Sequence, residues 1–135
     1  MNSEYKNFTD IATIEDISLL VHTFYDKIRK DDLLGSVFHA VIQNNWDVHL
    51  EKMVRFWQTV LFDTHTYFGR PFPPHANLPI EKVHFDRWLS LFTQTVDEHF
   101  SGEKADRAKW QAERMAEMFQ SKIAYYKQSN IRPII

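Results

Sequence analysis

The sequence predicts an all-α protein, and three observations lead to that fold class. Apolar residues recur at spacings of three and four over several long stretches, which is the period of a buried helix face. Only 3 of the 135 residues are Gly and 5 are Pro, too few for the many tight turns of a β-sandwich or barrel. Four of those prolines gather within residues 64–79, which leaves the rest of the chain open to helices.

The first predicted helix covers residues 14–30. Thr13 stands at its N-cap position, and Glu15 and Asp16 follow in the first turn, where negative charge favours a helix start. Tyr25 flanks the apolar stripe of this helix. The stripe consists of Ile14, Ile17, Leu20, Val21, Phe24 and Ile28.

Two more elements are predicted before the proline-rich stretch. A short one spans 33–42 and is interrupted by Gly35, and a longer helix spans 46–62 with Asn44 or Asn45 as its cap. The expected buried face of the longer helix is Trp46, His49, Leu50, Met53, Phe56, Trp57 and Val60.

Residues 64–79 are predicted to form a loop, because proline lacks an amide hydrogen and clashes with a preceding helical turn. Long loops in compact domains are often functional. Pro79 is expected to open a helix over 80–100. A last helix is predicted over 104–127, and the tail 129–135 is expected to fray. The expected core positions of these two helices are Val83, His84, Trp88, Leu91, Phe92, Thr95, Val96, Ala108, Ala112, Met115, Phe119, Ile123 and Tyr126.

Length and composition limit the domain count and the classes of function. The length fits one domain over 1–135, with its core over about 13–127. A net charge of −2 without a run of five basic residues gives no electrostatic footprint for nucleic acid. Cysteine is absent, and no apolar stretch approaches the ~18 residues of a membrane span. The N-terminus does not resemble a secretory signal, so we expect a soluble, cytoplasmic protein without nucleic-acid or membrane partners.

The candidate chemistry rests on histidines and polar aromatic residues. Motifs for phosphate loops, zinc proteases and serine hydrolases are missing. Tyr25, His49 and Trp88 come from three predicted helices, and each can hydrogen-bond inside a largely apolar pocket. Each of them alone is also a common core residue. On local pattern, His75 and His84 compete as a metal or cofactor ligand, and His84 has the better helical context.

Residues 20–120 resemble the third group of truncated haemoglobins. The segments that contain His75 and Trp88 carry the most specific likeness, and Trp88 follows His75 by thirteen positions. The lack of a Gly-Gly pair also fits this group. The matching segments are FYDK from Phe24, LGSVF from Leu34, WDVHLEKM from Trp46, FW from Phe56, GRPFPPHANLP from Gly69 and HFDRWLSLF from His84.

The resemblance implies a globin-like two-over-two helical sandwich around a b-type haem. His75 is then the proximal ligand of the iron, and the opposite face is open to a gas. Tyr25, His49 and Trp88 lie on this distal side. The Tyr25 hydroxyl and the Trp88 indole are the expected hydrogen-bond donors to a ligand. His49 is expected to control ligand access, to act through Tyr25, or to bind iron itself in the empty protein.

The resemblance also implies further contacts to the cofactor. Phe38 packs on the haem face, and Met53 crowds the ligand. Lys52 points to a haem propionate, and Arg70 is a second candidate for that contact.

The implied function is binding of O₂, NO and CO, with tight and slowly released O₂. Redox chemistry on reactive oxygen or nitrogen species is expected, with NO dioxygenation and peroxide reduction as candidate enzymatic activities. An external electron donor is then needed, since no flavin or reductase region is present. Three alternatives stay open: an oxygen-storage, transport or gas-sensing globin without turnover, a haem-free helical interaction domain, and a histidine-based transition-metal site. The oligomeric state is open as well.

Overall fold

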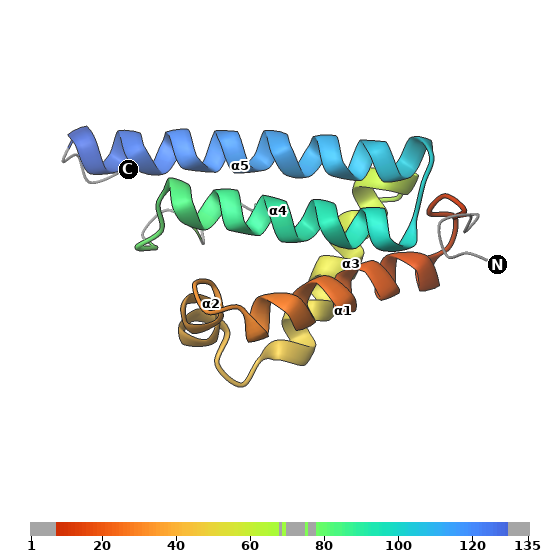
Figure 1. The fold of residues 1–135 in the computed structure, drawn as a ribbon, viewed down its shortest axis with the longest axis horizontal. Coiled ribbons are helices and arrows are strands. Elements are labelled where there is room, and N and C mark those ends of the chain that lie inside the picture. The colour runs from red at the N-terminus through yellow and green to blue at the C-terminus, as the bar shows by residue number, and fades with distance from the viewer. Residues whose placement is uncertain (1–7, 68, 70–74, 76–77, 130–135) are drawn as a thin grey trace.

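The computed structural model describes residues 8–67, 69, 75 and 78–129. This part of the chain contains five α-helices and no strand, as Figure 1 shows. The predicted all-α class is therefore confirmed. The helices are α1 (Ile14–Lys30), α2 (Gly35–Ile42), α3 (Trp46–Phe62), α4 (Lys82–His99) and α5 (Glu103–Ser129).

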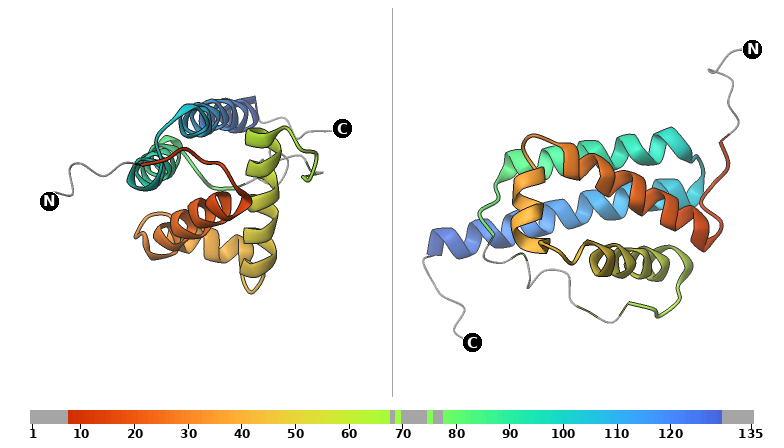
Figure 2. Two further views of the ribbon diagram at one scale, coloured as in Figure 1. Left: turned by 90° about the vertical axis from the view of Figure 1, so that its right-hand side faces the viewer. Right: turned by 90° about the horizontal axis from the view of Figure 1, so that it is seen from below.

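The four longer helices form two layers. α1 packs on α3 and on α4, α5 packs on α3 and on α4, and the short α2 packs on α1. Figure 1 shows α4 and α5 side by side along the long axis with α1 beneath them. In the left view of Figure 2, α3 runs across the direction of the other three long helices. The result is a two-over-two arrangement of α1 and α3 against α4 and α5.

The start of α1 follows from its local sequence. The Thr13 hydroxyl accepts a hydrogen bond from the Asp16 amide at 3.2 Å, and the Asp16 carboxylate accepts one from the Thr13 amide at 3.1 Å. This reciprocal pair satisfies two amide groups that the first helical turn leaves open. The predicted stripe is buried except for Ile14, which is 44% exposed, and Tyr25 is buried beside it.

Two predicted helix starts differ from the structure. Gly35 begins α2 instead of interrupting it. A Cβ there would lie 3.0 Å from the Arg29 carbonyl oxygen, so the position leaves little room for a side chain. α4 begins at Lys82 rather than at residue 80, and Pro79 lies outside it. The cap of α4 is Glu81, whose amide donates to His84 Nδ1 at 3.0 Å. Local capping thus outweighed the preference of proline for the first helical position.

The other bounds need smaller corrections. α3 has the predicted bounds with Asn45 at its N-cap, but the Asn45 side chain makes no capping hydrogen bond. α5 begins one residue earlier and ends two residues later than predicted, so Ser129 is helical rather than frayed. Val83, a predicted core position, is 54% exposed, whereas Phe85, two positions later, is buried. The side chain of Tyr126 and residues 130–135 lie outside the described residues.

The core consists of two clusters that share Trp88 and Met115 at their border. In the larger cluster, Phe92 lies between two indole rings, with centroids 5.0 Å from Trp57 and 5.7 Å from Trp88, both stacked. The smaller cluster lies between α4 and the second half of α5, and it comprises Ile80, Phe85, Ala116, Phe119 and Ile123. Small residues on α5 let its neighbours approach closely, and these are Ala105, Ala108, Ala112 and Ala116.

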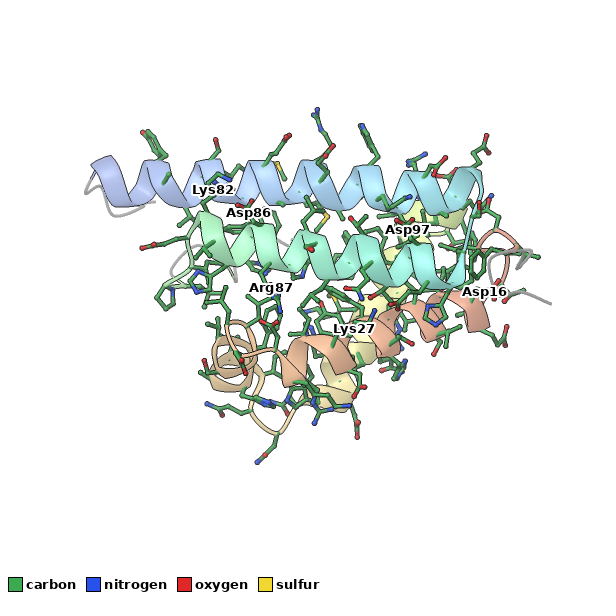
Figure 3. All side chains as sticks on the ribbon, viewed as in Figure 1. Asp16, Lys27, Lys82, Asp86, Arg87 and Asp97 are labelled. Atoms are coloured by element: carbon green, nitrogen blue, oxygen red, sulfur yellow. The ribbon has the colours of Figure 1, made fainter. Side chains whose placement is uncertain are left out.

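Charged side chains cover the outside of the helices, as Figure 3 shows. Several pair along or between helices, such as Lys82 with Asp86 at 2.8 Å and Lys109 with Asp97 at 2.7 Å. The predicted pair of Glu51 and Arg55 is present at 3.3 Å and exposed. Exposed pairs of this kind contribute little to stability. None of the described helices is both long and apolar enough to cross a membrane.

Candidate functional site

A cavity of about 230 Å³ is bounded by residues of both core clusters. All five helices contribute to its wall, together with His75 from the loop between α3 and α4. Most of the lining is aliphatic or aromatic. Among the lining residues that the structure describes, none is Asp or Glu, and Lys52 is the one permanent charge. Such a cavity suits an apolar molecule that carries negative charge at one edge.

The structure brings the predicted site residues to this one cavity. Arg70 lies outside the described residues, and every other predicted member lines the wall. The lining members of the predicted set are Tyr25 from α1, Phe38 from α2, His49, Lys52 and Met53 from α3, His75 from the loop, and Trp88 from α4. Residues from distant parts of the sequence therefore meet as a small apolar and aromatic group with few polar atoms.

Tyr25 lies in the centre of an aromatic group and is 6% exposed. Its ring centroid is 5.0 Å from that of His49, with the two planes perpendicular, and 6.0 Å from that of Phe38. Burial strongly raises the pKa of the Tyr25 hydroxyl. The hydroxyl therefore stays protonated at physiological pH and is available as a hydrogen-bond donor.

His49 is half-buried beside Tyr25, on the inward face of α3. Burial lowers the pKa of His49 to about 4, and the neighbouring Lys52 and His75 side chains act in the same direction. The imidazole is therefore neutral at pH 7. Its Nε2 atom is buried, and no described residue is its hydrogen-bond partner.

Trp88 is held from two sides. Its ring stacks on Phe92 with a centroid distance of 5.7 Å and meets the edge of Phe24 at 5.6 Å. These contacts leave the indole little freedom to rotate while one side of it borders the cavity. Trp88 is therefore a rigid part of the cavity wall.

The two competing histidines both line the cavity. The His75 ring lies 4.9 Å from that of Phe119 on α5. His84 uses Nδ1 to accept the hydrogen bond from the Glu81 amide, so one of its ring nitrogens serves as a helix cap. The favourable helical context of His84 therefore has a structural explanation.

The remaining predicted residues differ in depth. Phe38 and Met53 are partly buried and pack against the larger cluster. Lys52 is exposed, although its side chain contributes to the cavity wall. An exposed cation at the edge of an apolar cavity is suited to an anionic group that lies near water.

Tyr67 is a member of the cavity wall that the sequence analysis missed. Its ring meets Phe56 edge-on at 5.2 Å, and its amide donates to the Thr59 hydroxyl at 3.0 Å. A Cβ on Gly69 would lie 2.7 Å from the Tyr67 hydroxyl oxygen. Gly69, two positions after Tyr67, was the sequence signal that could have indicated this wall residue, since a glycine leaves space for the tyrosine ring.

The described residues fit a haem. The cavity offers apolar and aromatic walls for a macrocycle, imidazole groups of the kind that hold haem iron in globins, and Lys52 for a propionate. Within the described ranges, no three His, Asp or Glu side chains gather into a group that could hold a bare metal ion.

Fold and cavity together define a small helical protein with a two-over-two arrangement around an apolar pocket that contains histidines. The model of the bacterial-like globin family matches residues 7–123, and the chain belongs to this family. It is 31% identical over 116 residues to the group 3 truncated hemoglobin ctb of Campylobacter jejuni, covering 83% of this chain and 91% of that relative. The crystal structure of the group III truncated hemoglobin from Campylobacter jejuni matches with a TM-score of 0.81 and 29% identity. That match covers 89% of this chain and 98% of the other.

These findings confirm the resemblance to the third group of truncated haemoglobins and the two-over-two fold. Membership of the globin family implies that the chain binds haem and that small gaseous molecules are its ligands.

Proposed function

We propose that the protein holds haem b in the cavity, with His75 as the iron ligand, and that it binds O₂, NO and CO at a side formed by Tyr25, His49 and Trp88. The observation that carries this proposal is the meeting of these four residues on one apolar cavity whose described lining contains no carboxylate. When bound, haem supplies an iron atom that coordinates a diatomic molecule reversibly.

The polar residues of the cavity determine how strongly a ligand is held. Tyr25 stays protonated because burial raises the pKa of its hydroxyl, so it donates a hydrogen bond to a ligand that gains negative charge. The Trp88 indole can donate only. One hydrogen bond to a charged group contributes about 1.5–3 kcal/mol, which slows ligand release about ten- to a hundredfold. Two donors therefore favour tight, slowly released O₂.

The other predicted residues are proposed to hold the cofactor. Phe38 packs on the macrocycle, Met53 restricts the space for the ligand, and Lys52 pairs with a propionate. Arg70 is a second candidate for the propionate. The partly buried Phe38 and Met53 and the exposed Lys52 support these roles, since a haem needs apolar contact inside and a cation near water.

Slow release favours consumption of O₂ or a related molecule over its transport. In NO dioxygenation, one NO, one O₂ and one electron give one nitrate ion. In peroxide reduction, one H₂O₂, two protons and two electrons give two water molecules. Either reaction needs an external electron donor. The absence of cysteine fits the reducing cytoplasm, where we propose that the protein works.

The first test is the visible absorption spectrum of the purified protein, as isolated, then reduced, then with CO. We expect a sharp Soret band that shifts with CO. With haem supplied, His75→Ala should lose this spectrum and His84→Ala should keep it. Absence of a Soret band after haem titration would refute the proposal, and loss of the band in His84→Ala alone would move the iron ligand to His84.

A second test separates turnover from storage. The reduced, O₂-equilibrated protein is supplied with NO and an excess of a chemical reductant, and nitrate is measured per haem. Several nitrate ions per haem support an enzymatic role. A single equivalent, with O₂ otherwise bound and released, supports a storage globin.

A further inference from the structure

Trp46 packs against His49 and Tyr25, two polar residues that line the cavity. It is the first residue of α3 and 7% exposed, and it is not among the described residues that line the cavity. Its ring centroid is 6.1 Å from that of His49, with an interplanar angle of 87°, and 6.3 Å from that of Tyr25. Residues three positions apart share a helix face, so Trp46 and His49 are neighbours on α3.

Two other helices also contact the Trp46 ring. The Arg29 guanidinium of α1 lies 4.6 Å from the centre of the Trp46 ring, and the His39 ring of α2 lies 5.4 Å away. A cation over an indole face and an edge-on ring both fix the orientation of the tryptophan. Trp46 is therefore a fixed support, whereas His49 borders the cavity.

These two neighbouring rings each carry a buried polar atom. In the part of the chain that the structure describes, Trp46 Nε1 and His49 Nε2 are buried without a hydrogen-bond partner. Native proteins rarely leave such atoms unpaired. The two atoms are also complementary, since an indole N–H can only donate and an unprotonated imidazole nitrogen accepts.

We propose that Trp46 is a positioning residue for His49, and that its indole N–H is the hydrogen-bond partner of His49 Nε2 when the imidazole ring turns toward it. One rotation of a side chain then pairs both buried atoms. The consequence for ligands rests on the proposed function, because His49 can face a ligand only if the cavity binds one.

The pairing determines which groups are available to a ligand. It fixes the His49 proton on Nδ1, since Nε2 must accept. A His49 whose Nε2 is bound to Trp46 offers that atom to no ligand, so Tyr25 and Trp88 remain as the donors. Trp46 therefore controls the share of His49 in ligand binding without touching the ligand.

The test is nuclear magnetic resonance on the full-length protein, reduced and saturated with CO, with labelled indole and imidazole nitrogens. In His49→Leu, we expect the indole proton of Trp46 to exchange with water about two- to tenfold faster, which corresponds to loss of one hydrogen bond. The same exchange rate as in the unchanged protein would overturn the proposal.

A second pair of variants separates the hydrogen bond from packing. Trp46→Phe keeps a ring beneath Arg29 but removes the N–H, and we expect the proton of His49 to redistribute between Nδ1 and Nε2. The matched control is Trp110→Phe on the exposed face of α5, which should leave His49 unchanged. If Trp46→Phe keeps the tautomer of the unchanged protein, Trp46 acts by packing alone and the proposal is wrong.

Both signals come from side-chain nitrogens of the protein itself, so they can be recorded in the haem-free chain as well as in the CO-saturated protein. A protein without a Soret band would refute the proposed function, and the coupling between Trp46 and His49 would still be measured in the colourless chain. A protein with the band but without this coupling would keep the proposed function and refute the role of Trp46.

Discussion

The Arg87 guanidinium pairs with the carboxylate of Asp31, its Nε and Nη2 atoms lying 2.7 and 2.6 Å from the same oxygen. The Asp31 side chain is only 3% exposed, and its second oxygen accepts hydrogen bonds from the Leu33 and Leu34 amides, each at 3.0 Å. Because Trp88 follows Arg87, this contact ties the connection between α1 and α2 to the part of α4 that borders the cavity. Figure 3 shows the position of Arg87 on α4.

We expect Asp31→Ala to destabilise the protein by about 1–2 kcal/mol, because two amides lose the carboxylate that accepts from them. Arg87→Ala should also destabilise the protein, by a smaller amount. The measurement is urea denaturation followed by circular dichroism. Asp32→Ala is the matched control at the neighbouring exposed position. Equal effects at positions 31 and 32 would contradict the expectation.

The pair of Asp31 and Arg87 predicts that the stability of the protein depends on pH. Burial acts to raise the pKa of Asp31, but the hydrogen bonds from Arg87 and from the Leu34 and Leu33 amides outweigh it, and the pKa is lowered. A carboxyl group with a lowered pKa contributes stability above its unfolded value near 4, and this contribution is lost as the pH falls through the folded pKa. Asp31→Ala should therefore lose less stability than the unchanged protein below pH 4.

Asp10 is expected to stabilise the start of α5. Its carboxylate accepts hydrogen bonds from the Lys104 and Ala105 amides, both at 2.8 Å. Asp10→Ala should cost about 0.5–2 kcal/mol, the usual cost of losing a helix cap. Urea denaturation measures this, and Glu113→Ala on the exposed face of α5 is the control.

Gly102 provides a second test of this contact. It has a φ of +146°, and a Cβ on it would lie 2.5 Å from the Asp10 carboxyl carbon. Gly102→Ala should therefore destabilise the protein. Asp10→Gly removes both the carboxyl carbon and the Cβ, which a Cβ at position 102 would meet at 2.5 and 2.7 Å, so the combined variant should cost less than the two single costs together. Additive costs would show that the two residues act independently.

Tyr25→Phe tests the donor in the cavity. The substitution keeps the ring that packs on Phe24 and Phe38 but removes the hydroxyl. On the proposed function, O₂ should dissociate about ten- to a hundredfold faster, since one hydrogen bond to a charged group is lost. Stopped-flow measurement of O₂ release gives the rate. Tyr125→Phe, at an exposed position of α5, should leave the rate unchanged, and an unchanged rate in Tyr25→Phe would contradict the donor role.

His49 should make the protein less stable in mild acid. Burial lowers its pKa to about 4, so between the unfolded value near 6.5 and 4 the unfolded chain binds the extra proton. Stability therefore falls as the pH decreases through this window. His49→Leu should weaken that dependence, as measured by urea midpoints at several pH values. His65→Leu, at an exposed position, is the control, and an identical pH profile in both variants would refute the expectation.

Helix bounds followed from the sequence where the signals are local. The capping pair of Thr13 and Asp16 and the apolar period set α1, and α3 has the bounds that its period predicts. The start of α4 could not be predicted in this way, because Pro79 competed with the hydrogen bond between Glu81 and His84. Two local signals of similar strength need the three-dimensional geometry to decide between them.

The candidate site depended on the resemblance as well as on pattern. The position of a histidine on an apolar helix face indicated His49 as a candidate site residue. The local pattern favoured His84 over His75 as a ligand. In the structure, His84 accepts a hydrogen bond from the Glu81 amide at the start of α4, which explains its helical context. Tyr67 was missed, because its place in the wall depends on Thr59 of α3 and on the space beside Gly69.

The sequence by itself determined the helical class, the order of the helices and the family resemblance, because periodicity, caps and motifs are carried by residues close together in the chain. Only the tertiary structure decided that Tyr25 is buried beside His49, that Arg29 and His39 hold Trp46, and that Asp31 pairs with Arg87. Burial and pairing of these side chains depend on how helices pack, and packing joins residues whose separation along the chain leaves no local signal.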